Sequence, residues 1–272
     1  MPDHLAEGGP ALHAVADGGP GTPGARVVLV HGFTQTLAAW EPVAARLGAR
    51  WRVLRVDLPG HGGSAAVRAG FAEAAGLLGA CGGRAAYVGY SLGGRLCLRL
   101  ALDRPDLVRA LVLLGASPGI ADPAARAERA AADEALAAGI EREGVARFLD
   151  RWLAGPLFAT LPPERAGRAA RLANTPAGLA AALRRLGTGA QEPLWQRLAG
   201  LRCPTLLLAG ALDARFAAVA EQMAEAIGGR ARVALVPGAG HAAQLERPAE
   251  VAALLERFLA EHLEQEPSTR AP

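Results

Sequence analysis

Short runs of apolar residues alternate along much of the chain with longer stretches in which apolar positions recur every three or four residues. The short runs predict buried strands, and the longer spacing predicts amphipathic helices. Strands are expected at residues 12–15, 27–30, 53–57, 86–88, 111–114, 205–209 and 232–236, and helices at 38–47, 92–102, 219–227 and 248–262. This alternation predicts an α/β fold with a mostly parallel sheet, and the continuously apolar strands require helices on both faces.

The alternation stops between about residues 118 and 198, where Ala, Arg and Leu in helical spacing replace the strand pattern. One helix is expected to begin at Asp122-Pro123, because aspartate is a good N-cap and proline suits the first turn. The strand pattern resumes at Thr205. We therefore predict one compact domain with an α/β core at 1–117 and 199–272 and an inserted helical lid at 118–198. Such a lid covers the strand ends, where α/β folds bind their ligands.

Composition narrows the function further. The chain has 272 residues, of which 51% are hydrophobic, enough for one large core. All 29 basic residues counted as Lys+Arg are arginine, so lysine Schiff-base chemistry and a P-loop lysine are excluded. The net charge of +3 is spread among acids, and aromatics make up only 4%. A nucleic-acid partner is not expected, since it needs a dense basic patch and stacking aromatics.

The cysteines and the apolar runs indicate where the protein works. Cys81, Cys97 and Cys203 are odd in number and widely spaced among small or apolar neighbours. This pattern predicts buried free thiols in a reducing compartment, not a disulfide framework or a zinc site. No apolar run approaches the roughly 18 residues of a membrane span, and the N-terminus is acidic and broken by proline. We expect a cytoplasmic protein without membrane contact.

A G-x-S-x-G motif stands at Gly89-Tyr90-Ser91-Leu92-Gly93. It follows an expected strand and precedes an expected helix, which is the setting of a nucleophile elbow. In an elbow the flanking glycines permit a sharp turn that exposes the serine hydroxyl beside a helix N-terminus. The alternative is a tight turn whose serine only caps the helix.

A base, an orienting acid and two backbone donors can be placed from the strand pattern. His241 follows the last expected strand and Asp213 follows the one before it, which gives the order Ser, Asp, His of a hydrolase triad with Ser91. Phe33 comes after the expected strand 27–30, so its N–H can join that of Leu92, the residue after the serine, as an oxyanion hole. His61, in a turn-rich segment, is interpreted as structural.

The motifs H-G-F at 31–33, D-L-P-G-H-G-G-S at 57–64, G-Y-S-L-G-G at 89–94 and G-A-G-H at 238–241 occur in this order over nearly the whole chain. Together they resemble the α/β-hydrolase superfamily. Segments 62–66, 89–95, 152–158, 171–174 and 238–241 are more specifically similar to the MenH family, the 2-succinyl-6-hydroxy-2,4-cyclohexadiene-1-carboxylate synthases of menaquinone biosynthesis. The superfamily motifs do not separate these enzymes from esterases; Arg95 and the lid segments do.

The resemblance implies a lyase that eliminates pyruvate from 2-succinyl-5-enolpyruvyl-6-hydroxy-3-cyclohexene-1-carboxylate, with the triad used for proton abstraction and with no metal or organic cofactor. That substrate carries three carboxylates, and arginine suits such groups because its planar fork pairs with a carboxylate. Arg95 lies one helical turn after the serine. By similarity Arg126 and Arg171 are the other carboxylate ligands, and Tyr90 and Trp152 line the pocket.

Several alternatives stay open from the residues alone. Arg168 is a neighbouring candidate for the role of Arg171, and any single arginine in so Arg-rich a chain can be a solvated charge. A serine esterase, thioesterase or carbon-carbon bond hydrolase would use Ser91 as a nucleophile. A non-catalytic binding protein of the same fold is the remaining reading. The expected partner is a small multi-carboxylate substrate, and the expected assembly is a monomer or small homo-oligomer.

Overall fold

The computed structural model describes residues 11–18 and 25–263, so the outer ends of the predicted core lie outside the described residues. The described chain forms a seven-stranded sheet in the order β1-β3-β2-β4-β5-β6-β7. Its strands are β1 (Ala14–Asp17), β2 (Arg26–Val30), β3 (Arg52–Val56), β4 (Ala85–Tyr90), β5 (Val108–Leu114), β6 (Thr205–Gly210) and β7 (Ala231–Val236). Only β1 pairs antiparallel among these strands. The predicted α/β fold with a mostly parallel sheet is confirmed.

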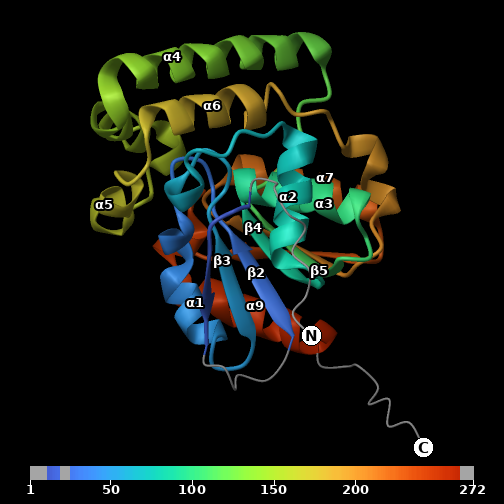
Figure 1. Cartoon of the computed structure of the whole chain (residues 1–272). Coiled ribbons are helices and arrows are strands. Elements are labelled where there is room, and N and C mark those ends of the chain that lie inside the picture. The colour runs from blue at the N-terminus through green and yellow to red at the C-terminus, as the bar shows by residue number, and fades with distance from the viewer. Residues whose placement is uncertain (1–10, 19–24, 264–272) are drawn as a thin grey trace, which may run out of the picture.

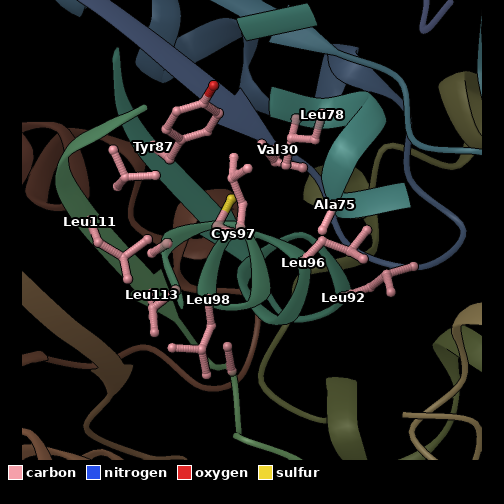
Figure 2. Close-up of a cluster of buried hydrophobic side chains, with 14 of the residues drawn as sticks. Val30, Ala75, Leu78, Tyr87, Leu92, Leu96, Cys97, Leu98, Leu111 and Leu113 are labelled. Carbon is pink, nitrogen blue, oxygen red and sulfur yellow. The ribbon is translucent and has the colours of Figure 1, made fainter. Parts of the chain in front are cut away.

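Helices cover both faces of the sheet (Figure 1). On one face lie α2 (Phe71–Gly82), α3 (Leu92–Asp103) and α7 (Ala214–Ile227), and on the other lie α1 (Glu41–Leu47) and α9 (Pro248–Leu263), with the short α8 (Ala243–Glu246) before it. Figure 2 shows part of the first face, where apolar side chains of α2, α3 and the strands gather around Leu96, Cys97 and Leu98 of α3. Burying such aliphatic side chains contributes about 1.5–3 kcal/mol each.

The structure differs from the sequence expectation at several elements; α7, for example, begins at Ala214, five residues before the expected start at Val219. The expected helix 38–47 begins as a 3-10 helix, η1 (Leu37–Trp40), before α1, and the first strand lies two residues later than expected. Helix α2 was not predicted, because Gly76 and Gly79 weaken its helical pattern. A Cβ on Gly79 would lie 2.7 Å from Leu100 Cδ1, so glycine there lets α2 pack closely on α3.

In the described chain the segment between β5 and β6 contains helices and no strand. Its elements are α4 (Pro123–Leu153), η3 (Pro156–Phe158), η4 (Pro163–Arg165), α5 (Arg168–Arg171), α6 (Pro176–Leu186) and η5 (Trp195–Gly200). Helix α4 begins as expected, with Asp122 Oδ1 accepting the N–H of Ala125 at 2.7 Å, and it is interrupted at Gly144, where φ is 78°. Helices α4 and α6 lie side by side above one end of the sheet (Figure 1). The division into core and lid stays a prediction.

Another short 3-10 helix, η2 (Gly62–Ser64), follows the loop after β3. Among the described residues, no helix has the length and apolar character needed to cross a membrane. Of the three cysteines, Cys97 and Cys203 are buried, as expected, whereas Cys81 is only partly buried.

Candidate active site

Ser91 occupies a sharp turn between β4 and α3. Its φ of 50° and ψ of −109° are a strained conformation for a residue with a side chain. The turn is held where the Ser91 N–H donates to the Leu114 carbonyl oxygen at 2.8 Å. A Cβ on Gly93 would lie 2.4 Å from the Val30 carbonyl oxygen, so only glycine allows the close approach of α3 to β2. The sequence motif thus has the local geometry of an elbow that exposes the serine hydroxyl.

A hydrogen-bonded chain leads away from the serine. His241 Nε2 lies 3.4 Å from Ser91 Oγ, and His241 Nδ1 lies 2.8 Å from Asp213 Oδ2. Asp213 is the N-cap of α7, where its other oxygen accepts the Phe216 N–H at 3.2 Å. Burial alone raises the pKa of the Asp213 carboxyl, but the hydrogen bond and charge of His241 lower this pKa by more, so the net shift is downward. An ionised Asp213 fixes the proton on Nδ1 and leaves Nε2 to accept the serine proton.

The backbone N–H groups expected to form an oxyanion hole lie at the same place. Leu92 is the first residue of α3, and Phe33 lies in the turn after β2. Both line the cavity that also contains Ser91 and His241. Within the described residues, neither the Phe33 nor the Leu92 N–H has a hydrogen-bond acceptor. Two residues with unengaged N–H groups therefore line the cavity that contains Ser91.

Thr34, the next residue after Phe33, is held in an unusual conformation by three residues from two other segments. Its φ is 66°, a left-handed value that is rare for a β-branched residue. Its N–H donates to His61 Nε2 at 3.3 Å, and its carbonyl oxygen accepts from Asn174 Nδ2 at 2.7 Å. Its hydroxyl oxygen accepts a hydrogen bond from Arg171 Nη1. The loop that presents the Phe33 N–H is therefore fixed partly by residues of the helical segment.

His61 has a structural position, as the sequence indicates. Its ring lies in the protein interior, and burial, followed by the nearby His31, lowers its pKa to about 3. A neutral ring that donates from Nδ1 to the Pro59 carbonyl oxygen at 3.0 Å leaves Nε2 free to accept the Thr34 N–H. Because burial keeps the His61 ring neutral, its Nε2 can accept the Thr34 N–H and so help hold the loop beside the serine.

Ser91 and His241 open onto a cavity of about 240 Å³, called here the serine cavity. Phe33, Trp152 and Leu157 form part of its apolar wall. It adjoins a wider opening of about 750 Å³, and the described residues that line both are Arg129, Trp152, Leu157, Arg215 and His241. Apolar walls with a few polar groups are typical of a site for a small organic ligand.

Arg95 lines this cavity and is buried, with 8% of its surface exposed. Its Nη1 donates to Gln191 Oε1 at 2.7 Å and its Nη2 to the Leu186 carbonyl oxygen at 2.9 Å. No carboxylate of the described chain forms an ion pair with it. Burial, followed by the charge of Arg129, lowers its pKa to about 9. An anion in the serine cavity would stabilise the charged guanidinium and so offset the cost of its desolvation.

The second expected arginine, Arg126, does not line the serine cavity, but the neighbouring Arg129 does. Arg126 Nη1 donates to the Ile120 carbonyl oxygen at 3.1 Å, and Arg126 is not among the described residues that line the serine cavity. Arg129, three residues later on α4, does line it and forms an ion pair of 2.7 Å with Asp133. Arg215 lines it as well. Neither Arg129 nor Arg215 was predicted from the sequence, although Arg215 follows Asp213 so closely that its position could have indicated it.

The third expected arginine lies in another part of the structure. Arg171 is buried, with 2% exposed, and is not among the described residues lining the serine cavity. Burial lowers its pKa to about 10. Its alternative, Arg168, is exposed and pairs with Asp150 at 2.8 Å. Neither arginine is therefore among the described residues that line the cavity beside Ser91.

The two aromatic residues expected at the pocket differ in position. Trp152 lines the serine cavity, where its ring lies 5.7 Å from that of Phe33. Tyr90 is buried behind the cavity, with its ring centroid 5.3 Å from that of His241, and burial raises the pKa of its phenol. In the part of the chain that is described, no group of three or more His, Cys, Asp or Glu side chains is arranged to bind a metal ion.

Comparisons with known proteins agree with this fold. The model of the "Alpha/beta hydrolase family" matches residues 27–254. The 2-succinyl-6-hydroxy-2,4-cyclohexadiene-1-carboxylate synthase of Salmonella schwarzengrund is 36% identical over 251 residues, which cover 88% of this chain and 96% of that relative. The structure of MenH from S. aureus has a TM-score of 0.85 at 30% identity and covers 92% of this chain and 98% of its own.

An esterase is also similar in structure. The thermophilic esterase from Thermogutta terrifontis, in a malate-bound form, has a TM-score of 0.80 at 27% identity, with 92% of this chain and 94% of that one covered. The fold therefore houses more than one activity, whereas the sequence identity over nearly the full length is higher to the synthases. This chain belongs to the alpha/beta hydrolase family and, within it, to the 2-succinyl-6-hydroxy-2,4-cyclohexadiene-1-carboxylate synthases.

Proposed function

We propose that this protein is a lyase that eliminates pyruvate from 2-succinyl-5-enolpyruvyl-6-hydroxy-3-cyclohexene-1-carboxylate. The observation that carries the proposal is the buried guanidinium of Arg95, which lacks an acidic partner among the described residues and lines the same cavity as Ser91 and His241. A substrate with several carboxylates supplies the missing anion. A neutral ester gains nothing from a buried cation at this position.

The reaction begins with proton abstraction at the carbon next to the succinyl ketone. Ser91 Oγ takes this proton while its own proton passes to His241 Nε2, and Asp213 stabilises the imidazolium that forms. The electron pair left on carbon moves through the ketone and the ring and breaks the bond to the enolpyruvyl oxygen. The released enolpyruvate takes up a proton and tautomerises to pyruvate.

The developing enolate oxygen needs donors that are already in place. The N–H groups of Phe33 and Leu92 are suited to this, since neither is engaged within the described chain and both line the serine cavity. Holding an enolate is the same electrostatic task as holding a tetrahedral oxyanion, and each such donor contributes about 2.7–4 kcal/mol to catalysis. No acyl-enzyme is required for this sequence of steps.

Three arginines of the described chain line the serine cavity and match a substrate with three carboxylates. Arg95 is the buried one, Arg129 is shared with Asp133, and Arg215 is exposed beside Asp213. We assign the most deeply enclosed carboxylate to Arg95. The other two carboxylates lie toward the wider opening that Arg129 and Arg215 also line.

Two further expectations belong to the same proposal. The protein acts in the cytoplasm, in keeping with three free cysteines and a reducing compartment. It works as a monomer or a small homo-oligomer on a small multi-carboxylate substrate. Chemical crosslinking and sedimentation of the purified protein test the assembly directly.

The second candidate is a serine esterase, which the structural similarity to the Thermogutta terrifontis esterase favours. In that case Ser91 attacks a carbonyl carbon and forms an acyl-enzyme. An assay of pyruvate release from the cyclohexene substrate, run beside hydrolysis of a p-nitrophenyl ester, separates the two. Pyruvate release without a burst of nitrophenol supports the lyase, and ester turnover without pyruvate release contradicts it.

A further inference from the structure

Glu246, the last residue of α8, carries a buried carboxylate that the proposed reaction does not use. Only 4% of its surface is exposed, and in the described chain no basic side chain donates to its carboxylate oxygens. It is not among the described residues that line the serine cavity. A carboxylate in the interior is unfavourable unless hydrogen bonds or a counter-charge stabilise it. The donors that stabilise it therefore indicate its role.

Both donors to this carboxylate flank the proposed catalytic base. Glu246 Oε2 accepts the Gly240 N–H at 2.8 Å, and Oε1 accepts the Ala242 N–H at 3.1 Å. Gly240 and Ala242 come immediately before and after His241. Among side chains, only a carboxylate offers two equivalent acceptor oxygens, so it can hold both peptide N–H groups at once. Glu246 thus restrains the backbone on each side of His241.

The other contacts of His241 act mainly on its ring. The ring centroid lies 4.6 Å from that of Phe216 and 5.3 Å from that of Tyr90. Such aromatic contacts accept a range of offsets and fix the position of the ring less sharply than hydrogen bonds do. Within the described residues, Glu246 is the one acceptor for the N–H groups of Gly240 and Ala242. The backbone position of His241 therefore depends on this carboxylate.

A small shift of His241 is enough to interrupt proton transfer. His241 Nε2 already lies 3.4 Å from Ser91 Oγ, near the upper limit for a hydrogen bond. Its other nitrogen, Nδ1, has to stay on Asp213 Oδ2, which lies 2.8 Å away. Misplacement of a catalytic group by about 1 Å lowers the rate by about 100-fold.

We propose that Glu246 is a positioning residue for His241. Its carboxylate holds the peptide N–H groups of Gly240 and Ala242, so that Nε2 of His241 stays within reach of Ser91 while Nδ1 stays on Asp213. The inference rests on the proposed role of His241 as the base. Because the lyase and the esterase share that role, the inference does not depend on which of the two reactions the protein catalyses.

Glu246→Gln tests the proposal, because it is nearly isosteric but keeps one acceptor oxygen and turns an NH2 group toward the other peptide N–H. Glu250→Gln, four residues later, removes the same charge from an exposed side chain and is the matched control. The readout is pyruvate release, or p-nitrophenyl ester hydrolysis if the wild type releases no pyruvate. Each variant is assayed at a temperature at which circular dichroism shows it fully folded.

For Glu246→Gln we expect kcat per folded enzyme to fall about 10- to 100-fold with KM within about twofold of the wild type. Glu250→Gln should change neither constant more than about twofold. If Glu246→Gln folds poorly, Glu246→Asp replaces it, since it keeps both acceptor oxygens but is one methylene shorter. Its kcat should fall at least about threefold, again with KM nearly unchanged.

The proton on His241 Nδ1 gives a readout that needs no substrate, because the hydrogen bond to Asp213 shifts its NMR resonance far downfield. We expect this resonance in the wild type and in Glu250→Gln, and a shifted or broadened resonance in the Glu246 variant. A Glu246 variant that unfolds at a lower temperature but keeps the wild-type kcat per folded enzyme and the wild-type resonance would overturn the proposal. A wild type that hydrolyses the ester and releases no pyruvate would contradict the lyase alone, because ester hydrolysis then reports the effect of Glu246.

Discussion

The hydrogen bond from Arg171 to Thr34 links the helical segment to the loop that presents the Phe33 N–H, and a double-mutant cycle measures this link. Thr34→Val keeps the β-branched shape and removes the hydroxyl acceptor, while Arg171→Met removes the donor. If Arg171 has a structural role, both substitutions remove the same Arg171–Thr34 hydrogen bond, so their effects on kcat should not add. A role for Arg171 as a direct substrate ligand, as the family resemblance implies, predicts independent effects.

The structure sets the expected magnitude. A buried hydrogen bond from a charged donor contributes about 1.5–3 kcal/mol. The left-handed conformation of Thr34 opposes it by about 1–3 kcal/mol, so losing one of its three restraints allows the loop to relax. At 1.4 kcal/mol per factor of ten, kcat should fall about 10- to 150-fold with KM nearly unchanged. Complete loss of an oxyanion donor, about 10²- to 10³-fold in kcat, is the upper limit.

Pyruvate release under saturating substrate gives kcat for the wild type, both single variants and the double variant. If Arg171 acts through Thr34, the double variant is no slower than the slower single variant, within about 0.5 kcal/mol. If the two losses in kcat multiply, or if Arg171→Met mainly raises KM, the reasoning is refuted. The wild-type rate separates this outcome from a failure of the proposed lyase activity, since a protein that releases no pyruvate yields no cycle.

Two further predictions concern charge. In pyruvate-release kinetics, Arg95→Met should lower kcat/KM about 10- to 150-fold, because it removes a charge-assisted hydrogen bond of about 1.5–3 kcal/mol. Arg129→Met should also lower kcat/KM, whereas Arg126→Met should change it less than about twofold. An Arg126→Met effect as large as that of Arg95→Met would contradict the cavity geometry. Because the pKa of His61 is lowered to about 3 in the folded protein, the unfolded chain binds a proton below pH 6.5 that the native state does not. The contribution of neutral His61 to the free energy of unfolding should therefore be fully present above about pH 6.5. Below that pH, the free energy of unfolding should fall by up to about 1.4 kcal/mol per pH unit toward pH 3. Urea unfolding of the wild type and His61→Asn checks this, and equal pH slopes would count against it.

The parts of the site that follow directly from a strand could be predicted from sequence. Ser91 and Asp213 follow fully buried strands and His241 follows the apolar run of the edge strand β7, and parallel strands bring such positions to one edge of the sheet. The glycines beside Ser91 also carry a local signal, because only glycine fits against the Val30 carbonyl oxygen. For these residues, local sequence and topology were sufficient.

Residues on the helical segment could not be placed in the same way. Arg126 and Arg129 are less than one turn apart on α4, and the direction in which that helix packs on α6 decides which one meets the cavity. The family resemblance implies a ligand-binding role for Arg171, but the pattern of residues does not reveal its long-range hydrogen bond to Thr34. These choices are made by tertiary packing between segments far apart in the chain.

The most direct test of the proposed function is pyruvate release from 2-succinyl-5-enolpyruvyl-6-hydroxy-3-cyclohexene-1-carboxylate by the purified wild type and by Ser91→Ala. We predict rapid release by the wild type and a loss of at least about 10³-fold in kcat for the variant, because proton abstraction needs the serine oxygen held by His241. A wild type that hydrolyses p-nitrophenyl esters but releases no pyruvate, or a Ser91→Ala variant as active as the wild type, would contradict the account.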